Sequence, residues 1–171
     1  MNRDYLFREI KKEEIPQMFS MILQRIEWMD RQGIEQWNKT GYIQAYPQSY
    51  YEEEREKGEV FVLADRSTGK LVSAAVLKEM DERWTDDRPA LYLHNFVSRI
   101  AVKNAGSIFL YFVEKYALKK GKKYLRLDSA EDNPILAQYY ESHGFMPVGK
   151  CEDGLYKGIL REKELREHAV K

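Results

Sequence analysis

The sequence predicts an α+β (mixed α/β) domain with one central, mostly antiparallel sheet and flanking helices. Antiparallel hairpin signals come first: apolar, β-branched residues 59–64 and 71–80 flank the turn at residues 66–69. A β-α-β pattern follows, with a strand at 91–98, a helical period starting at Ile108 and a strand at 124–128. Hairpins that precede a β-α-β unit are typical of this mixed class.

The N-terminal elements are a strand and two helices. Residues 5–10 alternate in polarity and predict a short strand. A helix over residues 14–31 is predicted by apolar residues at spacings of three and four, and Gly33 ends it. A short charged helix is predicted over residues 49–57.

The C-terminal elements are a helix and a hairpin. Gly121 ends the helix that contains Ile108. Asn133 and Pro134 predict the start of another helix, because Asn caps helices and Pro suits the first turn. Strands at 145–150 and 155–160 flank an Asp-Gly turn. The charged tail from Glu162 is expected to fray.

Composition narrows the class of protein. The 171 residues predict one domain over 1–171, and 28 basic residues balance 28 acidic ones, which argues against a nucleic-acid partner. Apolar runs are too short to cross a membrane, and the first residues lack a secretion signal, so we expect a cytoplasmic protein. The single cysteine, Cys151, allows no internal disulfide or zinc knuckle, and we expect no metal.

A strand, a loop of small residues and a helix follow one another between residues 91 and 120. The loop reads Lys103, Asn104, Ala105, Gly106 and Ser107. Small residues expose backbone amides, and a helix N-terminus carries partial positive charge, so this segment suits a pyrophosphate. A simple turn is the alternative interpretation.

A more specific motif lies near the C-terminus, and with it the chain resembles the GNAT acetyltransferases. The matching positions are Asn133, Leu136, Tyr139, Tyr140, Glu141, Gly144 and Phe145. The resemblance covers roughly residues 91–149. Residues 33–37, Gly-Ile-Glu-Gln-Trp, also look like a motif of small bacterial members.

The resemblance implies an acetyl-CoA site where the strands at 91–98 and 124–128 splay apart. Acetyl-CoA would be the co-substrate, held by the pantetheine-binding backbone and by the loop amides. The implied cofactor-binding residues are Phe96, Val97, Ser98, Lys103, Asn104, Ala105, Gly106, Ser107 and Asn133. The loop departs from the family pattern, because Asn104 stands at the first glycine and Ala101 at the usual Arg or Gln. Asn tolerates positive φ, so the turn is expected to persist.

The resemblance also implies direct attack of an amine on the thioester, with a base and an acid to move protons. Tyr140 matches the family's tyrosine acid. His94 is the first candidate base, since an imidazole has an ordinary pKa of about 6.5, and Glu79 is the second. Each has a structural alternative: Tyr140 and His94 as packed core residues, Glu79 as a surface carboxylate.

The resemblance also implies acceptor contacts between the first two helices, where the family binds acceptors, and the candidates are Trp37, Gln36 and Ile34. The aromatic residues Trp28, Trp37, Tyr42 and Tyr46 either form the wall of the acceptor pocket or belong to the core under a long loop. The expected acceptor is a small-molecule amine or a protein amine, and the charge balance does not choose between them.

Other functions stay open at this point. The same fold could serve as a non-catalytic acyl-CoA-binding module or as an interaction domain, and an unrelated mixed-sheet enzyme is a further alternative. The long C-terminal strands offer an edge for a homodimer.

Overall fold

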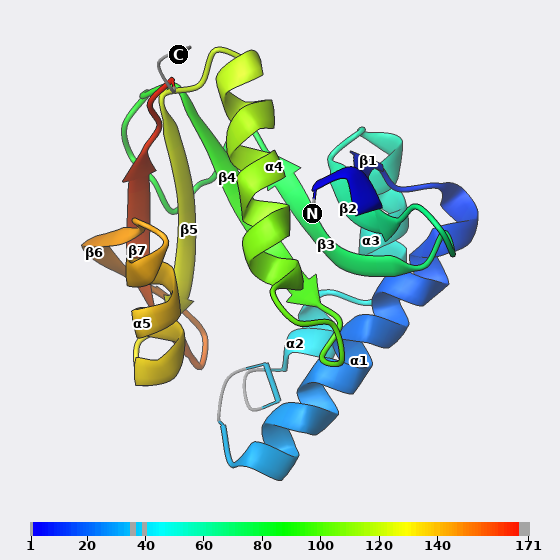
Figure 1. The fold of residues 1–171 in the computed structure, drawn as a ribbon. Coiled ribbons are helices and arrows are strands. Elements are labelled where there is room, and N and C mark those ends of the chain that lie inside the picture. The colour runs from blue at the N-terminus through cyan, green and yellow to red at the C-terminus, as the bar shows by residue number, and fades with distance from the viewer. Residues whose placement is uncertain (1, 35–36, 39–40, 168–171) are drawn as a thin grey trace. The chain divides into compact units, whose positions relative to one another are not determined.

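The computed structural model describes residues 2–34, 37–38 and 41–167 (Figure 1). The chain divides into two compact units. The first contains Met1–Leu77 and His94–Leu110, and the second contains Lys78–Leu93 and Tyr111–Lys171. Strand β4 (Ala90–Ser98) and helix α4 (Ala105–Lys119) contribute to both.

The strands of the first unit form an antiparallel meander. After a 3₁₀ turn, η1 (Asn2–Asp4), strand β1 (Tyr5–Glu9) pairs with β2 (Val60–Asp65), which pairs in turn with β3 (Leu71–Lys78). This confirms the predicted first strand and hairpin, although β3 ends two residues before the predicted Met80. All but the last residue of β2 and of β3 are buried, which explains their continuous apolar runs.

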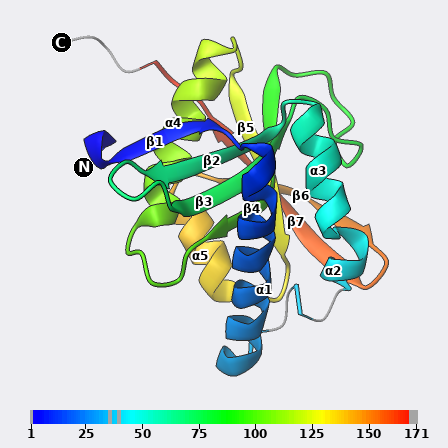
Figure 2. The same ribbon diagram turned by 90° about the vertical axis from the view of Figure 1, so that its right-hand side faces the viewer.

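Three helices pack on one face of this meander (Figure 2). They are α1 (Ile15–Gln32), which follows the 3₁₀ turn η2 (Lys12–Glu14), then α2 (Tyr42–Ala45) and α3 (Gln48–Glu56). The apolar stripe of α1 is buried against β2 and β3, as its periodicity predicted. Gly33 ends α1 at φ 69°, a left-handed conformation that glycine adopts without steric cost.

Four phenylalanine rings pack against one another at the start of α4 in the first unit. Phe7 of β1 stacks on Phe61 of β2 with ring centroids 5.4 Å apart, and Phe109 of α4 lies 5.7 Å from Phe7. Phe96 of β4 stacks on Phe109 at 5.5 Å. These contacts fix the N-terminal turns of α4 beside β4.

The second unit combines the start of β4 with β5 (Tyr124–Ala130), α5 (Pro134–Ser142), β6 (Met146–Asp153) and β7 (Tyr156–Glu164). The strand order along the sheet is β1-β2-β3-β4-β5-β7-β6, so the fold is the expected mixed α/β class. The β4–β5 pair is parallel, whereas β7 runs antiparallel to both β5 and β6. Among the described residues, the β4–β5 ladder joins only residues 90–92 to 124–126, in agreement with a splayed strand pair.

Two boundaries differ from the sequence prediction. Helix α4 begins at Ala105, three residues before Ile108, because small residues continue the helix before its apolar stripe starts. The predicted fraying tail from Glu162 was wrong: β7 continues to Glu164, and Leu165 is buried. The charged residues persist in the strand because Glu162 accepts a 2.7 Å hydrogen bond from Arg126.

Arg126 is a fully buried cation in the second unit. Its guanidinium forms two hydrogen bonds to Asp86, at 2.8 and 3.0 Å, and a third to Glu162. It also donates to the Tyr92 hydroxyl at 3.0 Å and lies 4.3 Å from the ring centroid of Trp84. A buried charge is tolerated when it is paired and hydrogen-bonded in this way. Arg126 therefore fastens the loop of Asp86 to β4, β5 and β7.

None of the described helices combines the length and the hydropathy that a membrane span requires.

Asp86→Asn tests the fastening of this loop. The bond to Arg126 holds the pKa of Asp86 below its ordinary value, so its charge stabilises the fold above an unfolded pKa of about 3.9. We expect a loss of about 1 kcal/mol at pH 7, since water screens a carboxylate that is 42% exposed. The deficit should vanish as the pH falls through the folded pKa, in urea denaturation series from pH 7 to pH 2.

The neighbouring Asp87→Asn is the matched control, because no hydrogen bond or ion pair of the Asp87 side chain occurs in the described part of the chain. Equal losses in the two variants would contradict the role given to Asp86.

Candidate active site

The first unit carries most of the residues that the sequence predicted for cofactor binding. His94, Phe96, Val97 and Ser98 lie in the second half of β4, beyond its ladder with β5. Val97 is buried, and the other three are half-buried. The Ser98 carbonyl accepts a 2.7 Å bond from Arg25 of α1, which leaves the backbone of this segment firmly positioned.

The loop after β4 leads into α4 through a left-handed residue. Asn104 has φ 63° and its carbonyl accepts from the Ile108 amide at 3.0 Å, so it caps the helix. Ala105, Gly106 and Ser107 therefore form the first turn of α4 rather than a loop. Amides of a first helical turn point along the axis without a carbonyl partner in the helix, and they favour an anion. The left-handed turn expected at Asn104 is confirmed.

Trp37, one of the candidate acceptor residues, belongs to an aromatic cluster in the same unit. Trp37 stacks on Tyr42 with ring centroids 4.4 Å apart and an interplanar angle of 12°. Its partly buried ring packs against the core under α1. Ile34 donates its amide to the Met29 carbonyl at 2.9 Å and so closes the end of α1. Gln36 lies outside the described residues. Packing accounts for Trp37 and Ile34, and contact with an acceptor stays a prediction.

Tyr140, the predicted acid, lies on α5 in the second unit. Its side chain is buried and packs edge-on against Tyr139 and Phe145 at 5.5 and 5.9 Å. Burial raises the pKa of Tyr140 well above its ordinary value, and the charges of Tyr139 and Asp128 add to this. The phenol is thus protonated at neutral pH, as a proton donor must be.

Other residues of the same motif hold α5 in place. The Asn133 side chain accepts from the Leu136 amide at 3.0 Å and caps α5, as expected from the Asn-Pro pair. Glu141 lies 3.4 Å from the buried Arg161, which also donates to the Phe145 carbonyl at 3.3 Å. Much of the motif therefore has a structural role, and the cofactor contact of Asn133 stays a prediction.

Glu79, the second candidate base, lies just beyond β3 in the second unit. Its carboxylate is 3.1 Å from Lys122 and 3.7 Å from Lys120, with 57% of the side chain exposed. The Lys122 hydrogen bond lowers the pKa of Glu79. These contacts favour a surface ion pair and weaken Glu79 as a base.

A sequence profile of the Acetyltransferase (GNAT) family matches residues 23–145, more than half of the chain. The chain belongs to the GNAT acetyltransferase family. No curated protein shows a significant sequence match to it.

Solved structures of GNAT proteins share the fold. A GNAT acetyltransferase from Listeria monocytogenes has a TM-score of 0.76 at 24% identity, over 94% of this chain and 95% of that one. The Streptococcus agalactiae GNAT acetyltransferase gives 0.75 at 20% identity, with 95% and 96% covered. The Thermoplasma acidophilum PaiA N-acetyltransferase, in complex with coenzyme A, gives 0.69 at 18% identity, with 94% and 98% covered.

Sequence reasoning missed a polar cluster at the end of β5 in this GNAT protein. Asp128 accepts a 2.6 Å bond from the Tyr156 hydroxyl, and Arg83 lies 3.7 Å from its other oxygen. Gly158 makes room for the cluster: a Cβ there would lie 2.7 Å from the Tyr156 ring and 2.9 Å from the Cys151 sulfur. Burial raises the pKa of the Cys151 thiol to about 11. In the sequence, the spacing of Tyr156 and Gly158 gave no recognisable indication of this cluster.

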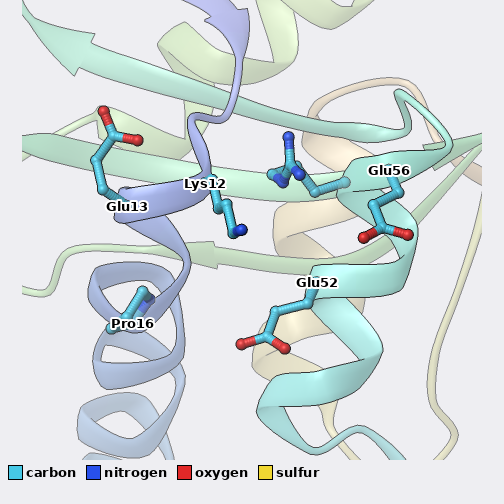
Figure 3. A pocket seen from close by; sticks show the side chains of 6 residues that line it. Lys12, Glu13, Pro16, Glu52 and Glu56 are labelled. Atoms are coloured by element: carbon cyan, nitrogen blue, oxygen red, sulfur yellow. The ribbon is translucent and has the colours of Figure 1, made fainter.

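A hollow of about 550 Å³ lies between the start of α1 and α3. Figure 3 shows Lys12 and Glu52 extending from the two sides toward the space between them. Three carboxylates and two cations line it, together with Pro16: Lys12, Glu13, Glu52, Arg55 and Glu56. None of the predicted site residues is among them, so the hollow has no place in the candidate mechanism.

Substitutions at Asn104 test the left-handed turn before α4. Asn104→Ala should destabilise the fold by about 1 kcal/mol, because a Cβ without a local hydrogen-bonding group disfavours positive φ. Asn104→Gly should be neutral or slightly stabilising, since glycine adopts this conformation freely. Urea denaturation of the three proteins measures the difference, and Ala and Gly variants of equal stability would refute the assignment.

Proposed function

We propose that this GNAT protein is an acetyl-CoA-dependent N-acetyltransferase that acetylates a primary amine. The observation that carries the proposal is the start of α4: a left-handed Asn104 followed by a first turn of small residues that can approach a pyrophosphate closely. The coenzyme A complex of the Thermoplasma PaiA protein and the acetyl-CoA complex of Salmonella typhimurium yncA support this choice of ligand.

In this proposal, each segment of the first unit takes one part of the cofactor. The amides from Lys103 to Ser107 bind the pyrophosphate. The backbone of Phe96, Val97 and Ser98 binds the amide groups of the pantetheine arm, because these residues lie beyond the β4–β5 ladder. The bond from Arg25 to the Ser98 carbonyl keeps this strand end in position before the cofactor arrives.

The chemistry is direct transfer. A base removes a proton from the substrate ammonium, and the neutral amine attacks the thioester carbonyl. The carbon–sulfur bond then breaks and the thiolate takes a proton from Tyr140. The nitrogen gives up its second proton to solvent as the amide forms, and solvent reprotonates the Tyr140 phenolate. His94 is the better candidate base, because Glu79 is held by two lysines and its pKa is lowered.

Calorimetry with acetyl-CoA, followed by a coenzyme A release assay over a panel of amines, tests the proposal. The panel should include small aliphatic amines, polyamines, amino sugars and peptides with free N-termini or lysines. Binding with turnover of one class establishes the reaction. Saturable binding with no turnover across the panel would favour an acyl-CoA-binding module, and no binding would overturn the proposal.

Tyr140→Phe tests the proton donor. Removal of a general acid should lower kcat by a factor of about 10²–10⁴ and leave the Kd for acetyl-CoA unchanged. Tyr139→Phe removes a neighbouring hydroxyl of the same helix and is the matched control. Full activity in the Tyr140 variant would leave its buried ring with a packing role alone.

His94→Ala and Glu79→Gln separate the two candidate bases. We expect kcat to fall by about 10²–10⁴ for His94→Ala, because the substrate ammonium then loses its proton acceptor. Glu79→Gln should behave like wild type. The opposite pattern would transfer the role to Glu79.

A further inference from the structure

Asn95 is a left-handed residue inside a β-strand. Its φ is 55°, and β4 continues on both sides of it. Among the described residues, Asn104 is the other non-glycine residue with positive φ. Asparagine is depleted in strands but tolerates this conformation better than most side chains. A residue held this way inside a strand requires surroundings that fix it.

Two tyrosine hydroxyls fix the Asn95 side chain. Tyr50 of α3 donates to Oδ1 at 3.1 Å, and Nδ2 donates to the Tyr42 hydroxyl of α2. Both amide atoms therefore have partners within the first unit. Burial raises the pKa of both tyrosines well above the ordinary value, so their hydroxyls stay protonated.

The tyrosines also pack against neighbouring aromatic rings. Tyr42 stacks on Trp37 with ring centroids 4.4 Å apart and lies tilted against Tyr46 at 4.9 Å, and Tyr50 lies tilted against Tyr46 at 4.9 Å. The rings form a continuous row from the segment after α1 to α3. Asn95 thus joins this row to β4.

Asn95 lies between the candidate base and the backbone proposed to bind the cofactor. His94 precedes it, and the backbone from Phe96 to Ser98 follows it. A left-handed residue turns the backbone relative to an extended strand, so it resets the directions of the N–H and C=O groups that follow.

We propose that Asn95 is a positioning residue for acetyl-CoA: its left-handed backbone, clamped by Tyr42 and Tyr50, aims residues 96–98 at the pantetheine arm. The inference rests on the proposed function and adds a specific cause for the pre-organisation of that strand. Asn95 touches neither cofactor nor substrate in this scheme and acts through the backbone that follows it.

Four variants test the proposal by calorimetry with acetyl-CoA and by steady-state kinetics. Asn95→Ala disfavours positive φ, and Asn95→Gly allows it without the side chain. The double variant Tyr42→Phe/Tyr50→Phe removes both hydroxyls and keeps the rings. Tyr46→Phe is the matched control, because its hydroxyl makes no bond to Asn95 in the described part of the chain. Thermal unfolding shows that each variant is folded at the assay temperature.

We expect the Kd for acetyl-CoA to rise about tenfold in Asn95→Ala, because alanine disfavours the left-handed conformation at this position. In Asn95→Gly the Kd should rise less than about threefold, because glycine adopts this conformation freely. The double tyrosine variant should fall between them, and Tyr46→Phe should match wild type. KM for acetyl-CoA should rise with kcat little changed, a split that loss of stability alone does not produce.

Either of two binding results would overturn the inference: a folded Asn95→Ala variant with wild-type affinity, or equal weakening by Ala and Gly. Failure of the wild type to bind acetyl-CoA would instead overturn the proposed function. The backbone claim is then tested by hydrogen exchange: the amides of residues 96–98 should exchange faster in Asn95→Ala than in Asn95→Gly, and equal rates would refute it.

Discussion

The candidate site depends on a backbone constraint: two asparagines in the left-handed region, Asn95 within β4 and Asn104 just before α4, bracket the segment of residues 96–103. The first redirects the end of a strand and the second starts a helix. Glycine would allow both turns but would leave them flexible, whereas asparagine keeps a side chain that can be anchored. Tyr42 and Tyr50 provide that anchor at Asn95.

In the second unit, buried arginines hold the elements together. Arg126 is buried among Asp86, Glu162 and the rings of Trp84 and Tyr92, and this cation joins a loop to three strands. Arg161 similarly ties α5 to β7 through Glu141 and the Phe145 carbonyl. Residues of the motif that resembles the family therefore serve largely to pack α5, and this packing positions the buried Tyr140.

The sequence predicted the order of strands and helices well, because apolar periodicity and Gly, Asn and Pro signals are local. It misplaced boundaries where tertiary contacts decide them: Glu162 stays in β7 because Arg126 reaches it from β5. The residues proposed to bind the cofactor were assigned through the family resemblance, and their contact with it stays a prediction. The clamp on Asn95 could not be predicted, because its two tyrosines lie far from Asn95 in the sequence: Tyr50 is 45 positions away and Tyr42 is 53 positions away. The one signal that could have indicated it is an asparagine within a strand, where this residue is depleted.

The environment of Cys151 bears on how turnover can be followed. Its thiol is half-buried beside Gly158, and burial raises the pKa of this thiol, so less of it is thiolate at pH 8 than of an exposed cysteine. Disulfide reagents react with thiolates, so the protein's single cysteine should remain silent on the timescale of a colorimetric assay. The colour that develops in such an assay should then come mainly from free coenzyme A, even at the higher enzyme concentrations that slow acceptors require.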